Sequence, residues 1–224
     1  MSPSVGRSAV ILAGGNSSRM GEEKDFLEFD GKPLLSRTVE KLGRVTDEIV
    51  VVARDEAQAE LLGKLFSRGQ APGPRLLFTW DSVKGFGPVA GLDAGMAIAS
   101  GTLAFAAGCD LPFLKPEVVS RLFEKAEEEM DLEAVVPIQA EGVYEPLHSV
   151  YRREKMLFLC RRALEKGERR IYNILQDLRI RCVRMECFRP LDPELLSFFN
   201  LNTPLDLEAA RALWQLQAQV RQLE

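Results

Sequence analysis

The sequence has 224 residues, of which 46% are hydrophobic and 28% are charged, and this composition excludes a disordered or a fibrous protein. Its net charge of −4 at pH 7 provides no basic field for nonspecific binding, so we expect no nucleic-acid partner. The start MSPSVGR has no apolar signal segment and no window of about 18 apolar residues follows, so we expect a cytoplasmic protein without membrane association.

Strands and helices are predicted to alternate through the first part of the chain. Continuous β-branched or apolar runs predict buried strands, and apolar residues at helical spacing, several with Pro at the start, predict helices. The expected elements are strand 8–12, helix 33–43, strand 48–53, helix 56–66, strand 76–80, helix 88–100, strand 102–107, helix 116–130 and strand 134–138. This βα alternation predicts an α/β protein with a doubly wound, mostly parallel sheet.

The regularity weakens after residue 138, where a mixed sheet edge is expected. The patterns there predict strand 147–151, helix 153–166, strand 179–186 and helix 205–223. No repeat or linker interrupts the chain, so we expect a single domain over 1–224, with a flexible start over 1–6.

The loop after the first strand, LAGGNSSRMGEEK over 12–24, is typical of a phosphate site. Its glycines allow backbone N–H groups to converge on an anion, and Arg19 and Lys24 can neutralise phosphate charge. It matches neither the Walker pattern nor GxGxxG. The residues alone leave open a simple glycine-dependent turn with two solvated cations.

Asp110 in CDLPF follows the strand 102–107, so it is expected at the carboxyl end of a strand, where open α/β sheets bind ligands. A carboxylate there can hold Mg²⁺ against a phosphate. The alternative is an aspartate that caps the helix near Pro116.

A second glycine-rich loop runs over 81–92, DSVKGFGPVAGL, before the helix 88–100. Asp81 and Gly87 are expected to face the same ligand-binding edge as Asp110. Helix capping and close packing through Gly91 would explain the same residues, and both explanations can hold together.

The second half offers candidates for contact with an acceptor. His148 lies in PLHSVY, Arg169 and Arg170 form an adjacent guanidinium pair suited to an anion, and Asn200 and Asn202 share one side of an extended segment. The alternatives are a structural histidine, a solvated helix end and simple helix capping in NTP. The four cysteines have no CxxC pair and His148 is the only histidine, so zinc is not expected.

These segments resemble the motifs of the molybdenum cofactor guanylyltransferases and their nucleotidyltransferase relatives. LAGGNSSRMGEEK is similar to LAGGxSxRMGxxK, CDLPF to CDxPF, DSVKGFGPVAGL to a base-binding D…GPxAGL loop, and PLHSVY and NLNTP to acceptor-side elements. The resemblance implies a Rossmann-like three-layer nucleotidyltransferase (GT-A-like) fold. It implies that the nucleotide contacts Leu12, Ala13, Gly14, Gly15, Lys24, Asp81, Gly87 and Asp110. It implies that Arg19, Lys24 and Asp110 are catalytic, with Asp110 as the Mg²⁺ ligand. On the acceptor side, it implies contacts from His148, Asn200 and Asn202.

The activity implied is transfer of GMP from GTP to molybdopterin, which forms molybdopterin guanine dinucleotide and releases pyrophosphate, with Mg²⁺ as cofactor. Other molybdenum cofactor biosynthesis proteins would be partners. The sequence departs from many relatives at Ala53-Arg54-Asp55, where an asparagine helps to read the base. Transfer of CMP to molybdopterin, transfer to a sugar or alcohol phosphate, and noncatalytic GTP binding therefore remain alternatives. A nicotinamide oxidoreductase is disfavoured by the missing GxGxxG.

Overall fold

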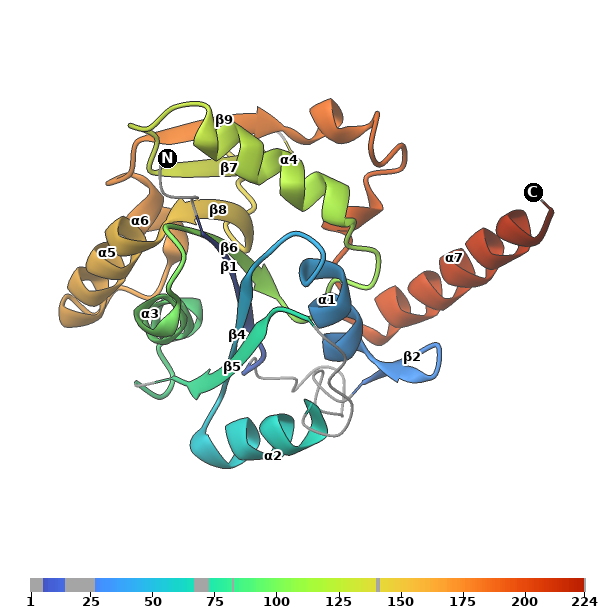
Figure 1. Ribbon diagram of the computed structural model, residues 1–224, viewed down its shortest axis with the longest axis horizontal. Helices are drawn as coiled ribbons and strands as arrows, with labels where there is room; N and C mark the ends of the chain where they lie inside the picture. The colour runs from blue at the N-terminus through green and yellow to red at the C-terminus, as the bar shows by residue number, and fades with distance from the viewer. Residues whose placement is uncertain (1–5, 15–26, 67–72, 82, 140–141, 224) are drawn as a thin grey trace.

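A computed structural model describes residues 6–14, 27–66, 73–81, 83–139 and 142–223, with side chains to residue 219. Within this part of the chain, seven strands form one sheet in the order β5-β4-β1-β6-β8-β7-β9 (Figure 1). The strands are β1 (Arg7–Leu12), β4 (Glu48–Ala53), β5 (Arg75–Trp80), β6 (Leu103–Gly108), β7 (Ala134–Ile138), β8 (His148–Arg152) and β9 (Ile180–Arg184).

The sheet is mostly parallel with a mixed edge. β5, β4, β1 and β6 pair in parallel, β8 pairs antiparallel with both β6 and β7, and β9 pairs in parallel with β7. The chain winds from β1 outward to β5 and then returns to place β6 on the other side of β1. This reversal opens a crevice beyond the carboxyl ends of β1 and β6, where doubly wound sheets bind ligands.

Helices cover both faces of the sheet, giving three layers (Figure 1). One face packs against α1, α2 and α4, and the other against α3, α5 and α6. Their bounds are α1 (Leu34–Leu42), α2 (Glu56–Phe66), α3 (Pro88–Ile98), α4 (Pro116–Glu127), α5 (Arg153–Glu165) and α6 (Ile171–Leu175). β4 is buried at every position, as its continuous EIVVVA run predicts.

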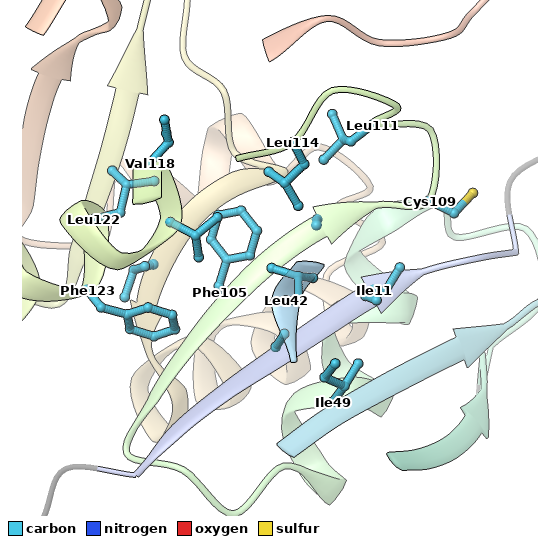
Figure 2. Close-up of a cluster of buried hydrophobic side chains, with 14 of the residues drawn as sticks. Ile11, Leu42, Ile49, Phe105, Cys109, Leu111, Leu114, Val118, Leu122 and Phe123 are labelled. Carbon is cyan, nitrogen blue, oxygen red and sulfur yellow. The ribbon is translucent and has the colours of Figure 1, made fainter. Parts of the chain in front are cut away.

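The core on the α1–α4 face shows how strands and helices interlock. Figure 2 shows Leu42 of α1 in one cluster with Ile11 of β1 and Ile49 of β4, and with Phe105 of β6 and Phe123 of α4. These side chains are fully buried. Burying an aromatic or leucine side chain stabilises the fold by about 1.5–3 kcal/mol, so this cluster fixes how α1 and α4 sit on the sheet.

A buried carboxylate ties the amino ends of the central strands together, at the edge opposite the crevice. Glu48 Oε1 accepts hydrogen bonds from Ser8 Oγ at 2.6 Å and from the Ser100 N–H at 2.5 Å, and Ser8 Oγ accepts one from the Gly101 N–H at 2.9 Å. Burial acts to raise the pKa of Glu48, but these hydrogen bonds together outweigh it and lower the pKa, so the carboxylate stays charged.

The last helix, α7 (Pro204–Leu223), extends outward from the body beside the small hairpin of β2 (Glu28–Phe29) and β3 (Lys32–Pro33) (Figure 1). An aromatic cluster anchors it to the body: the Phe29 ring of β2 lies 6.0 Å from the Phe113 ring and 5.3 Å from the Trp214 ring of α7, both edge to face. Phe113 belongs to CDLPF, so this cluster joins the hairpin, the segment after β6 and the last helix.

The predicted α/β class, mixed edge and long elements are confirmed, and some details differ. The predicted strand 179–186 ends at Arg184, because Met185 and Phe188 turn into the core through the 3₁₀ helix η2 (Met185–Phe188). The hairpin β2–β3, α6 and the 3₁₀ helix η3 (Leu196–Phe198) were not predicted. Among the described helices, none is long and apolar enough to cross a membrane.

Candidate active site

A cavity of about 460 Å³ opens at the carboxyl ends of β1, β4, β5 and β6. Its described wall consists of Leu12, Gly14, Val52, Asp81, Gly85, Gly87, Pro88, Gly91, Gly108, Cys109, Asp110 and Leu147. The three loops that carry the sequence motifs therefore converge here, although they are far apart in the chain. The volume lies in the range of small-molecule and nucleotide sites.

Close backbone approach shapes two walls of this cavity. A Cβ at Gly14 would lie 2.7 Å from the backbone nitrogen of Arg54, so a side chain there would push the ends of β1 and β4 apart. A Cβ at Gly91 would lie 2.9 Å from Leu12 Cδ2 and 3.3 Å from Asp81 Oδ1. Glycine at both positions keeps the strand ends and α3 close while leaving backbone exposed to a ligand.

Asp110 lies at the end of β6, where the side chain folds back over Gly108. A Cβ at Gly108 would collide with Asp110 Oδ1, so the glycine makes this carboxylate position possible. The Asp110 carbonyl accepts a hydrogen bond from the Leu201 N–H at 3.0 Å. Asp110 is thus fixed on one side by β6 and on the other by the segment that precedes α7.

Asp81 faces the same cavity from the end of β5. Its N–H donates to the Ala53 carbonyl at 3.1 Å, which continues the pairing of β5 with β4. Burial raises the pKa of the Asp81 carboxyl to about 6. A half-buried carboxyl that titrates near neutrality is a strong acceptor for N–H or O–H donors of a ligand, since a donor would replace the solvent that burial removed.

The loop after Asp81 reaches α3 through two glycines in the left-handed region, Gly85 with φ 77° and Gly87 with φ 64°. Both line the cavity, and a Cβ at either would meet open space, so the backbone conformation and not crowding requires glycine here. Gly87 directly precedes Pro88, which occupies the first turn of α3.

The predicted arginine pair lies across this loop, between α5 and α6. The Arg169 guanidinium lies 4.9 Å from the centre of the Phe86 ring. Arg170 is exposed and immediately precedes α6. The structure thus brings the acceptor-side candidate Arg169 against the nucleotide-side loop.

His148 is not part of the described wall of this cavity, and its role as an acceptor contact stays a prediction. Its side chain is buried between Phe198, with ring centres 4.5 Å apart, and Phe105, at 5.2 Å. Neither ring nitrogen has a hydrogen-bond partner among the described residues. The neighbouring Leu147, in the turn that leads into β8 (His148–Arg152), lines the cavity instead.

Asn200 and Asn202 flank Leu201, whose N–H bonds to the Asp110 carbonyl, so their backbone lies beside the cavity. The described cavity wall includes neither side chain. Asn200 Nδ2 lies 3.4 Å from the Phe198 carbonyl, and Asn202 is exposed. Ala13 is also set back from the wall: it is buried and its N–H donates to the Val52 carbonyl at 2.8 Å.

Three predicted site residues, Gly15, Arg19 and Lys24, lie outside the described residues. The sequence prediction missed Val52, Gly85, Gly108, Cys109 and Leu147 as cavity residues. All of these except Gly85 stand at or near strand ends, and that position is the signal that could have found them. In the described ranges, no group of three or more His, Cys, Asp or Glu side chains could hold a metal ion unaided.

Residues 9–181 match the family model of the MobA-like NTP transferase domain. The chain belongs to this family. The family assignment makes it a nucleotidyltransferase, with the cavity as its candidate active site.

Similar proteins agree with the family. A Methanosarcina mazei protein named "Probable molybdenum cofactor guanylyltransferase" is 39% identical over 90% of this chain and 88% of its own length. The molybdenum cofactor guanylyltransferase of Desulfosudis oleivorans is 34% identical over 91% of this chain and 93% of its own length. The crystal structure of molybdopterin-guanine dinucleotide biosynthesis protein A from Archaeoglobus fulgidus superimposes with a TM-score of 0.77 at 35% identity, covering 93% of this chain and 98% of that one.

Proposed function

We propose that this nucleotidyltransferase transfers GMP from GTP to molybdopterin, forming molybdopterin guanine dinucleotide and releasing pyrophosphate. The observation that carries the proposal is the convergence of Asp110, Asp81 and the Gly14 backbone on one cavity at the switch point of the sheet. The names of relatives at 34–39% identity over most of the chain supply the two substrates.

Asp110 fits a Mg²⁺ ion that arrives with the nucleotide. Mg²⁺ in nucleotide sites commonly takes one or two carboxylates, with the remaining ligands from substrate phosphates and water, so a larger protein cluster is not required. When bound, the ion would neutralise charge on the transferring phosphate. The Asp110 backbone is held by Leu201 and its side chain lies over Gly108, so the carboxylate is positioned before the ligand binds.

The reaction is an in-line exchange at phosphorus. A phosphate oxygen of the acceptor forms a bond to the α-phosphorus of GTP, the bond to the α–β bridging oxygen breaks, and pyrophosphate leaves with that electron pair. The protein contributes orientation: glycine backbone at positions 14 and 91 lets the nucleotide approach the strand ends, and the Asp81 carboxylate accepts hydrogen bonds from the nucleoside. Such positioning and charge neutralisation can supply the acceleration without a covalent enzyme intermediate.

The test is a titration of the purified protein with GTP, CTP, ATP and UTP, each with and without Mg²⁺, followed by measurement of pyrophosphate release with molybdopterin. GTP-selective binding that strengthens with Mg²⁺, with turnover only when both substrates are present, is the expected result. Selective turnover of CTP would replace GMP transfer by CMP transfer. Binding of GTP without turnover by the wild-type protein would reduce it to a nucleotide-binding protein.

A further inference from the structure

The described residues of the nucleotide-side loop between β5 and α3, which are 81 and 83–87, make few backbone hydrogen bonds within the loop. Its described backbone hydrogen bonds lie at the two ends, from the Asp81 N–H to Ala53 and from the Ala90 N–H to the Gly87 carbonyl. Between them, Gly85 and Gly87 both occupy the left-handed region with open space around them. Because glycine has the greatest backbone freedom, the partly buried ring of Phe86 is the main side chain that can fix this part of the cavity wall.

Arg169 reaches that ring from a segment that is itself well fixed. α5 ends at Glu165 and is followed by Gly167 at φ 74°, and the Glu168 N–H returns to the Ala163 carbonyl at 2.8 Å. The Glu168 carboxylate then accepts hydrogen bonds from the Arg169 and Arg170 N–H groups, both at 2.8 Å, and from Asn173 Nδ2 at 2.6 Å. This capping directs Arg169 away from the α5 axis and toward the loop.

We propose that Arg169 is a positioning residue for the nucleotide site: its guanidinium, stacked on Phe86, holds the Gly85–Gly87 wall in the shape that binds the nucleotide. This inference rests on the proposed function for the identity of the nucleotide. It assigns Arg169 a role on the nucleotide side, separate from direct contact with the acceptor. Arg–aromatic stacking is favourable because the ring face carries partial negative charge.

The consequence is a specific kinetic signature. Without the stack, nucleotide binding must also order the loop, so the affinity for GTP falls while the acceptor KM is unchanged. Exposed cation–π pairs correspond to about a 2- to 5-fold change in an equilibrium constant. A direct acceptor contact would instead raise the acceptor KM and leave GTP affinity unchanged.

The experiment is a double-mutant cycle on GTP affinity, measured calorimetrically with Mg²⁺, using Arg169→Met, Phe86→Leu and the double variant. We expect each single change to weaken GTP binding about 2- to 5-fold. The double variant should bind GTP as well as the single variant that has the lower affinity. Arg169→Lys, which retains a cation, is expected to fall between wild type and Arg169→Met. Unchanged GTP affinity, or effects that simply multiply in the double variant, would overturn the proposal.

A second arginine–ring pair provides the matched control. Arg162 lies 5.7 Å from the Phe158 ring within α5, and neither residue is part of the described cavity wall. Arg162→Met and Phe158→Leu should leave GTP affinity unchanged. A similar loss in these variants would mean that the Arg169 effect is a general loss of surface packing.

Amide hydrogen exchange in the nucleotide-free protein separates this proposal from the proposed function. Arg169→Met should accelerate exchange in the peptide over residues 83–88, and Arg162→Met should not. If the wild-type protein fails to bind GTP but Arg169→Met still loosens this peptide, the function fails and the positioning role stands. If exchange is unchanged, the positioning role fails whatever the nucleotide.

Discussion

Replacing His148 by leucine is expected to alter the pH dependence of stability and leave catalysis intact. Burial lowers the pKa of His148 from 6.5 to about 3, against a smaller opposing effect of Asp192. The ring is therefore neutral in the folded protein at pH 5, whereas it is protonated in the unfolded chain. The unfolded state binds the extra proton, so this group makes the fold less stable as the pH falls below 6.5.

The size of this stability loss follows from the difference between the pH and the ordinary pKa of histidine. At pH 5.0 the unfolded histidine lies about 1.5 units below its ordinary pKa, and each unit corresponds to about 1.4 kcal/mol, so His148 removes about 2 kcal/mol of stability between pH 7.5 and 5.0. Leucine does not titrate. At pH 7.5 the leucine variant loses the two ring contacts of His148, but it also removes two buried nitrogens that lack partners among the described residues. We therefore expect its free energy of unfolding to lie within about 1 kcal/mol of wild type.

Urea unfolding of both proteins at pH 7.5 and 5.0 measures the difference directly. The free energy of unfolding of wild type should fall by about 2 kcal/mol more than that of His148→Leu, and other titrating groups cancel in the comparison. Equal pH dependence in the two proteins would refute the buried, neutral histidine. A raised KM for molybdopterin at pH 7.5 with unchanged stability would show instead that the ring reaches the acceptor.

Three further predictions concern the cavity, and a fourth concerns the opposite edge of the sheet. Asp110→Asn should lower kcat by at least about 100-fold with little change in melting temperature, measured by pyrophosphate release; near-normal turnover would exclude Asp110 as the Mg²⁺ ligand. Gly14→Ala should cost about 1–3 kcal/mol in urea unfolding and weaken GTP binding, because its methyl group would meet Arg54 backbone; an unchanged affinity would contradict the close approach. The pKa of Asp81 is near 6, so its carboxylate is lost as the pH falls through 6, and GTP affinity should fall more steeply below that pH in wild type than in Asp81→Asn; parallel profiles would argue against contact with the nucleoside. Glu48→Gln should destabilise the protein by about 1–3 kcal/mol with kcat unchanged, since its hydrogen bonds lie far from the cavity; a matching loss of kcat would contradict that separation.

Long, strongly patterned elements could be predicted from the sequence because their own residues determine them. The strand 48–53 and the helix 56–66 begin and end where the β-branched run and the helical spacing predict. α6 has only five residues and the strands of the β2–β3 hairpin only two each, too few for a period to be seen. Their stability comes from packing against distant segments, which a local pattern does not contain.

The candidate site also contains residues that could be predicted from the sequence and residues that could not. The convergence of Asp81 and Asp110 could be predicted because both follow strands expected to be parallel, and parallel strands end at one edge. The orientation of His148 could not, because it depends on the register in which β8 pairs with β6. That register places His148 opposite Ala107, and a shift of one residue would turn its side chain to the other face of the sheet.

The hydrogen bond from Leu201 to Asp110 and the contacts of Phe113 with Trp214 have a consequence for biosynthesis. Strands β1, β4, β5 and β6 and helix α3 are all synthesised before residue 110, so the glycine-lined wall can assemble early on the ribosome. The segment that carries Asp110 gains its supporting contacts only after Trp214 has emerged. The Asp110 carboxylate should therefore be the last part of the cavity to reach its final position. If the proposed function holds, a ribosome-bound chain that stops short of α7 should bind nucleotide before it is able to turn it over.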